Sequence, residues 1–213
     1  MFTTLTAYLN TLAELSLSTQ ATDQGAAALS LDEGAERALQ MILSTGAASR
    51  KIMLAGNGGS AALVSHMQND ICKAVGVRGM VFTEQPLLTA LTNDDGYEAA
   101  FERPVQLWAE PGDLMVTVSS SGSSVNLLRA AHAALERGCR LITLTGFRPD
   151  NPLRQLGDIN FYVNSDVYGY VETAHAALTH FMTDRAKYIK EAESDSVRGV
   201  AAPRTSFRRA EGA

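Results

Sequence analysis

The feature that most constrains the fold is the regular alternation, after residue 50, of short apolar segments with longer helical ones. Segments of strand length lie at 51–55, 79–82, 114–118, 140–144 and 159–163, and helical patterns fill the intervals and continue from about 170 to 192. Strands that alternate with helices of this length predict a parallel sheet with helices on both faces. We therefore expect an α/β fold, a three-layer α/β/α sandwich with a central parallel sheet, whose ligands bind beyond the carboxyl ends of the strands.

The two ends of the chain differ from this central pattern. Leucines at 5, 9, 12, 15 and 17 predict one helix, and a second follows the start signal Asp32-Glu33, with a loop expected near 23–28. We assign residues 1–48 to N-terminal helices that serve oligomerisation and residues 49–193 to the main domain. Residues 194–213 are rich in Ser, Ala, Gly, Pro and Arg without periodicity, which predicts a flexible tail.

The composition of the chain limits the classes of molecule that it is expected to bind. The net charge of −5 gives no attraction to nucleic acid or to an anionic membrane, so neither is an expected partner. A phosphorylated ligand would then need a local positive field, such as loop amides. The N-terminus lacks a basic region followed by an apolar run, and no apolar stretch approaches the roughly 20 residues that span a bilayer. We expect a cytoplasmic protein with Cys72 and Cys139 as reduced thiols.

Two loops between a strand and a helix carry the strongest functional signal. The first is Gly56-Asn57-Gly58-Gly59-Ser60, and the second is Ser119-Ser120-Ser121-Gly122-Ser123-Ser124. Glycine lets backbone amides approach a ligand, and Ser60 is a candidate N-cap for a helix that begins at Ala61. Amides at a helix N-terminus favour a phosphate or a row of sugar hydroxyls. One such loop is often no more than a turn, but two on neighbouring strands indicate a shared binding site.

Neither loop matches the common nucleotide motifs. No Gly-Lys-[Ser/Thr] follows, so the first loop is not a Walker A loop. It also lacks the third glycine of a dinucleotide fingerprint. A ligand other than a nucleotide is therefore favoured.

These residues resemble the phosphoheptose isomerase family of sugar isomerase (SIS) domains. The resemblance covers about residues 30–190. It is carried by Gly56–Ala62, His66, Asn93-Asp94, Gly96–Glu98, Ser119–Ser124, Leu144–Gly146 and the helix of His175 and His180. It implies a flavodoxin-like SIS domain that interconverts sedoheptulose 7-phosphate and D-glycero-D-manno-heptose 7-phosphate, or a related C6–C8 sugar phosphate, through an enediol. It also implies a homotetramer with sites at subunit interfaces.

The resemblance assigns substrate-binding residues to both loops, with one more between them in the sequence. They are Asn57, Gly58, Gly59, Ser60, Asp94, Ser119, Ser120, Ser121 and Ser124.

A divalent metal, with zinc as the first choice, is implied at His66, Asp70, Glu172 and His180, where the family has His, Glu, Gln and His. The same set is reasonable on its own residues. His66 and Asp70 are four apart on one helix face, and Glu172 and His180 are eight apart, within roughly 80° of each other. Two imidazoles and two carboxylates suit zinc or a similar ion. A surface salt bridge is the alternative for His66 and Asp70.

The resemblance implies His180 and Asp70 as the acid and base, with Glu172 able to share the role. The chain departs from the family at Asp70 and Glu172, and also at Ala74 and Gly169, where the family often has Arg and Asp. These departures predict an altered substrate pocket. They also keep a second function open, a non-catalytic SIS module, like the DnaA initiator-associating protein, that binds a partner or senses a phosphosugar. His175 is expected to face the core or a subunit contact.

Overall fold

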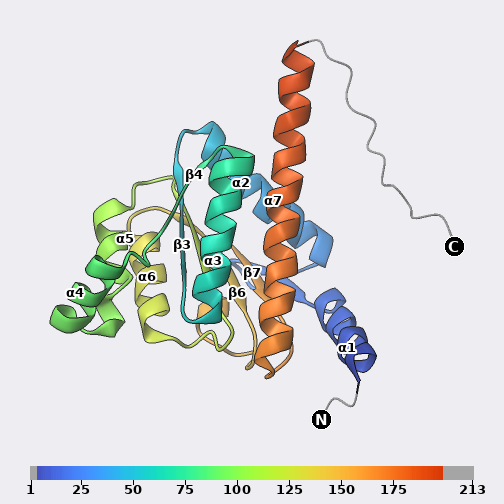
Figure 1. Cartoon of the computed structure of the whole chain (residues 1–213), viewed down its shortest axis with the longest axis horizontal. Helices are drawn as coiled ribbons and strands as arrows, with labels where there is room; N and C mark the ends of the chain where they lie inside the picture. Colours follow the sequence, from blue (N-terminus) through green and yellow to red (C-terminus); the bar gives the residue numbers. More distant parts are fainter. Residues whose placement is uncertain (1–3, 199–213) are drawn as a thin grey trace, which may run out of the picture.

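A computed structural model of the chain describes residues 4–198 (Figure 1). Seven strands form one sheet within these residues, in the order β2-β1-β7-β6-β5-β3-β4. The strands are β1 (Gln20–Asp23), β2 (Ala28–Leu29), β3 (Lys51–Gly56), β4 (Arg78–Val81), β5 (Leu114–Ser119), β6 (Arg140–Thr145) and β7 (Ile159–Tyr162).

The helices surround this sheet. They are α1 (Leu5–Leu17), α2 (Leu31–Ala47), α3 (Gly59–Asp70), α4 (Gln85–Asp95), α5 (Glu102–Trp108), α6 (Val125–Glu136) and α7 (Tyr168–Arg198), with the short turns η1 (Ile71–Val75, a π-helix), η2 (Tyr97–Ala99) and η3 (Leu153–Gln155). No helix within residues 4–198 combines the length and apolar character that crossing a membrane requires.

The five predicted strands form the parallel part of the sheet, in the order β7-β6-β5-β3-β4. Side chains alternate between its faces. Ile52 and Leu54 pack with α2, α3 and α7, whereas Met53 and Ala55 pack with α5 and α6. The three-layer α/β/α sandwich is therefore confirmed. Along the chain, the strand order reverses at β3, which has β4 on one side and β5 on the other, and this reversal opens a crevice between the loops that follow β3 and β5.

The sheet also contains an antiparallel hairpin that the sequence did not predict. The segment expected as a loop near 23–28 joins β1 to β2, and β1 pairs antiparallel with β7. The Asp23 carboxylate accepts hydrogen bonds from the amides of Gly25 and Ala27, both at 3.0 Å, which closes the turn. The strands were missed because they are short and mostly polar, and only Ala21 of β1 is buried.

The N-terminal helices differ in their packing. Ser30 and Glu33 form a capping box at the start of α2, whose apolar face lies in the same core as the sheet. Helix α1 buries none of its residues, and Leu5 and Leu17 are 73% and 78% exposed. It lies beside the start of α7, where Tyr8 stacks on Tyr170 with ring centroids 4.6 Å apart (Figure 1).

Two predicted boundaries were wrong. Helix α3 begins at Gly59 and not at Ala61, so Ser60 lies in its first turn and Gly58 is the N-cap residue. Helix α7 continues to Arg198, so the first residues of the predicted tail are helical. Their sequence contains no Pro or Gly before residue 199, and the helix therefore has no stop signal there. Residues 199–213 of the predicted tail lie outside the described part of the chain.

Candidate active site

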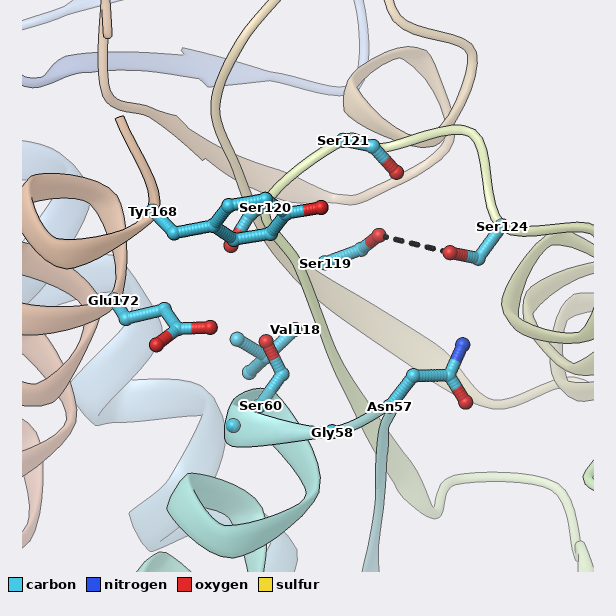
Figure 2. Close-up of a pocket in the computed structure, with 11 residues that line it drawn as sticks. Asn57, Gly58, Ser60, Val118, Ser119, Ser120, Ser121, Ser124, Tyr168 and Glu172 are labelled. Carbon is cyan, nitrogen blue, oxygen red and sulfur yellow. Dashed lines mark hydrogen bonds between the residues drawn. The ribbon is translucent and has the colours of Figure 1, made fainter. Parts of the chain in front are cut away.

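The two predicted loops converge on one pocket at the carboxyl end of the sheet. The loop from β3 to α3 faces the loop from β5 to α6 across a pocket of about 230 Å³ (Figure 2). The lining residues are Asn57, Gly58, Gly59, Ser60, Val118, Ser119, Ser120, Ser121, Ser124, Tyr168 and Glu172. Eight of the nine residues predicted to bind substrate are in this set. The ninth, Asp94, lies on exposed helix α4 and accepts a hydrogen bond from Asn93 at 2.7 Å.

Backbone amides supply the positive potential of this pocket, because its lining contains no Lys or Arg. The first turn of a helix leaves amide groups without partners inside the helix, and at α3 these include the amides of Gly59 and Ser60. Helix α6 begins directly after Ser124, so a second helix N-terminus faces the same pocket. The arrangement suits an anion held by amides and hydroxyls.

The serine turn depends on Gly122. Its φ of 62° lies in the left-handed region, and a Cβ there would come within 1.9 Å of Asn151 Oδ1. The turn is closed by the Gly122 amide, which donates to the Ser119 carbonyl at 3.1 Å. The hydroxyl oxygens of Ser119 and Ser124 lie 3.5 Å apart across the turn (Figure 2). Ser120 is 5% exposed, and among the described residues its hydroxyl has no hydrogen-bond partner, which leaves it available to a ligand.

A pair of side-chain amides joins the two loops at the pocket. Asn57 and Asn126 exchange two hydrogen bonds between their side chains, each 3.0 Å long. Tyr97 donates a third, from its hydroxyl to Asn57 Oδ1 at 2.7 Å. Asn57 is thereby held with its side chain against α6, and the two loops are fixed relative to each other. Sequence reasoning did not identify Asn126, because an Asn near a helix start has no distinctive motif.

Three of the four predicted metal ligands lie together. His66 Nε2 is 3.4 Å and His180 Nδ1 is 3.7 Å from the same oxygen, Asp70 Oδ2. One ligand atom from each of the three residues lies within 4.8 Å of the others. Two imidazoles and a carboxylate are a donor set that catalytic zinc sites use, with a further position left to water or substrate. The imidazole side chains are about half exposed, so the cluster is open to solvent.

Glu172 lies apart from that cluster. Its carboxylate faces the start of α3, where a Cβ on Gly59 would come within 2.7 Å of Glu172 Oε1. Helices α3 and α7 lie side by side and begin at the same end of the sheet (Figure 1). Glu172 precedes His180 by eight residues, which is about 12 Å along a helix at 1.5 Å per residue. The rise along α7 places Glu172 at the pocket and His180 at the His66–Asp70 cluster.

His175 occupies the core, one of the two positions expected for it. It is fully buried, and its Nε2 lies 3.1 Å from the Thr145 carbonyl oxygen. Burial lowers the pKa of His175 to about 4, because a charged imidazolium would be removed from water. The ring is therefore neutral at physiological pH, with Nε2 donating to Thr145.

The fold and the paired ligand loops define a class of protein, and comparison with known families agrees. Residues 19–146 match the family model described as "SIS domain", so the chain belongs to the SIS-domain family. A solved phosphoheptose isomerase from Neisseria gonorrhoeae has a similar fold, with a TM-score of 0.74 and 26% identity over 85% of this chain and 96% of that one.

Curated relatives narrow the family further. Phosphoheptose isomerase from Aliarcobacter butzleri is 35% identical over 156 residues, which cover 70% of this chain and 82% of the relative. Phosphoheptose isomerase from Geobacter sulfurreducens is 34% identical over 151 residues, or 68% of this chain and 79% of the relative. Within the SIS domains, the chain belongs with the phosphoheptose isomerases, and the predicted resemblance is confirmed.

Two lining residues, Val118 at the end of β5 and Tyr168, were not among the predicted site residues. Tyr168 opens α7 and forms a wall of the pocket, although the sequence pattern placed the start of that helix near Tyr170. An exposed tyrosine beside Val167 and Gly169 carries no motif, so only the tertiary structure identifies it as part of the site.

Proposed function

We propose that the protein is a sugar-phosphate aldose–ketose isomerase that converts sedoheptulose 7-phosphate to D-glycero-D-manno-heptose 7-phosphate, or acts on a closely related C6–C8 sugar phosphate. The observation that carries the proposal is the convergence of the two amide- and hydroxyl-rich loops on one pocket. The names of the relatives support the same reaction.

Binding is assigned to the loops. The amides of the α3 start and the hydroxyls of the serine turn would hold the phosphoryl group and the sugar hydroxyls. Asp94 is retained as a partner for a sugar hydroxyl. Asp94 does not line the pocket. To contact a sugar hydroxyl, it must bind a part of the ligand that extends out of the pocket, or a ligand bound to another subunit.

The chemistry requires a proton to move between C1 and C2. A base removes the proton from C1 of the ketose while the carbonyl oxygen at C2 gains one, which gives the enediol; C2 is then protonated as the oxygen at C1 loses its proton. Glu172 is the carboxylate that lines the pocket, so we assign it the proton on carbon. Asp70 and His180, which lie together, are assigned the proton on oxygen.

A divalent metal, most suitably zinc, would be held by His66, Asp70 and His180, and would polarise the substrate carbonyl when bound. An imidazole that binds a metal through one nitrogen can carry a proton only on its other nitrogen. In the metal-bound protein the proton on carbon would therefore fall to Glu172.

We also propose a cytoplasmic homotetramer in which residues 1–48 contribute to assembly, with residues 49–193 as the catalytic domain. The exposed leucines of α1 support an assembly role. Light scattering at micromolar concentration tests it, and a monomer would contradict the tetramer.

Incubation with sedoheptulose 7-phosphate, with and without a chelator, tests the reaction directly. We expect aldose formation, measured by chromatography of the sugar phosphates, and its loss in Glu172→Gln. Failure to convert any C6–C8 ketose phosphate at any metal loading would overturn the proposal. Thermal stabilisation by the phosphosugar without turnover would then favour the binding module.

A further inference from the structure

Most of the residues that line the pocket are serine, glycine or asparagine. Of its lining side chains, only those of Val118 and Tyr168 are large and apolar. Val118 is completely buried beneath the pocket floor, whereas Tyr168 is 61% exposed. The ring of Tyr168 is therefore the apolar surface that a bound molecule can cover.

The Tyr168 ring rests on a rigid support. It meets the ring of Phe147 edge to face, with centroids 4.9 Å apart and planes at 80°. Phe147 has a φ of 58°, a conformation that a bulky residue rarely adopts unless its surroundings impose it. Two hydrogen bonds of 2.9 Å impose it here, from the Phe147 amide to the Ser165 carbonyl and from the hydroxyl of Tyr162 to the Phe147 carbonyl.

A buried polar group lines the same pocket as the Tyr168 ring. In Figure 2 the ring overlaps Ser120 in projection, and both residues line the pocket with Glu172. Ser120 is buried, and its hydroxyl has no partner within residues 4–198. A ligand that satisfies Ser120 therefore occupies the pocket that the Tyr168 ring also lines.

We propose that Tyr168 is a specificity-determining residue whose ring stacks on the C–H face of a sugar phosphate. The carbon chain of a sugar carries C–H groups between its hydroxyls, and the apolar face of an aromatic ring can pack on these C–H groups. Inorganic phosphate has no C–H face. The ring thus makes the pocket select phosphorylated carbon chains over phosphate alone. The class of ligand rests on the proposed function, but the stacking contact does not require turnover.

The test compares two ligands that cannot be isomerised. Sedoheptitol 7-phosphate, the reduced alditol, keeps the chain and the phosphate but has no carbonyl; inorganic phosphate keeps only the anion. Calorimetric titration of the full-length protein gives both affinities. We expect Tyr168→Ala to weaken alditol phosphate binding about tenfold, which is about 1.4 kcal/mol, and to change phosphate binding less than about twofold.

Two further variants separate stacking from other effects. Tyr168→Phe keeps the ring and is expected to bind the alditol phosphate within about twofold of the parent protein, because the stacking surface is unchanged. Tyr188→Ala removes a tyrosine of similar exposure, 55%, from the same helix outside the pocket, and should change neither affinity. Circular dichroism confirms folding of each variant.

The outcomes distinguish this inference from the proposed reaction. The stacking role would be overturned if Tyr168→Ala weakened the binding of both ligands equally or of neither. It would also be overturned if the parent protein did not bind the alditol phosphate more tightly than inorganic phosphate. Turnover is measured separately with the ketose. A protein that shows the expected affinities but no isomerisation would retain the Tyr168 contact and lose the isomerase proposal.

Discussion

Asn57 and Asn126 lie 69 positions apart in the chain and exchange a reciprocal pair of side-chain hydrogen bonds, each 3.0 Å long. Asn57 is the first residue after β3, and Asn126 lies in the first turn of α6, after β5. The pair therefore sets the relative position of the two loops that form the pocket. Asn126 is 3% exposed, so its amide is shielded from competing water.

Loss of the hydrogen-bonded pair of Asn57 and Asn126 should lower catalytic efficiency more than it lowers the stability of the fold. In Asn126→Ala the Asn57 amide keeps only the bond from Tyr97, and we expect about a tenfold fall in kcat/KM with about 1–3 kcal/mol lost from the free energy of unfolding. Steady-state kinetics and urea denaturation check the two effects. Gln155→Ala, at an exposed position outside the pocket, is the matched control and should change neither. An unchanged kcat/KM in Asn126→Ala would contradict the positioning role.

The amount of bound metal should depend on His66, Asp70 and His180, and should not depend on Glu172. His66→Ala and His180→Ala each remove one of three donors, so we expect metal bound after dialysis to fall at least tenfold, measured by elemental analysis. Glu172→Ala should keep the metal content of the parent protein, because the Glu172 carboxylate lies at the start of α3 and outside the cluster. Alanine is used because glutamine would keep an oxygen that can bind a metal. Equal metal loss in Glu172→Ala would show that four residues, and not three, form the site.

Stability should fall as the pH drops through the window set by His175. Its pKa is about 4 in the folded protein and about 6.5 in the unfolded chain, so only the unfolded chain gains a proton between these values. The contribution is complete above pH 6.5 and declines toward pH 4. We expect about 2 kcal/mol to be lost from the free energy of unfolding between pH 8 and pH 5.

Urea denaturation of two variants at pH 8 and pH 5 isolates the contribution of His175 to the pH dependence of stability. His175→Gln should flatten the pH dependence by that amount, whereas His132→Gln, at an exposed position, should retain it. The same slope in both variants would assign the pH dependence to other groups.

Gly122 should tolerate alanine far less well than another glycine of similar backbone conformation. Gly76 has a φ of 71° and no heavy atom within 4 Å of a Cβ position, so Gly76→Ala should cost only the left-handed conformation, about 1 kcal/mol. Gly122→Ala adds a clash with Asn151, and we expect a loss of about 3 kcal/mol or more. Thermal or urea denaturation measures both. Similar losses in the two variants would mean that the Asn151 contact relaxes without cost.

Much of this protein follows from local sequence. Each strand of the parallel sheet is a short apolar run, and each ligand loop combines Gly and Ser directly after such a run, as at Gly58 and Ser120. Strand direction and the edge that carries the loops follow from these patterns, because parallel strands with helical connections end at the same edge. The spacing of four residues within a predicted helix also placed His66 and Asp70 on one helix face.

Tertiary structure decided the features that depend on groups far apart in the chain. The β1–β2 hairpin forms because β7 offers an edge to a short polar strand, which no periodicity within residues 20–29 reveals. The separate surroundings of Glu172 and His180 depend on how α7 lies against α3. The spacing of two residues on a helix fixes the angle and the rise between them, but it does not fix which residues of another helix lie beside each of them. Tyr168 became a pocket wall, and Asn126 a partner of Asn57, only through packing of elements that are remote in sequence.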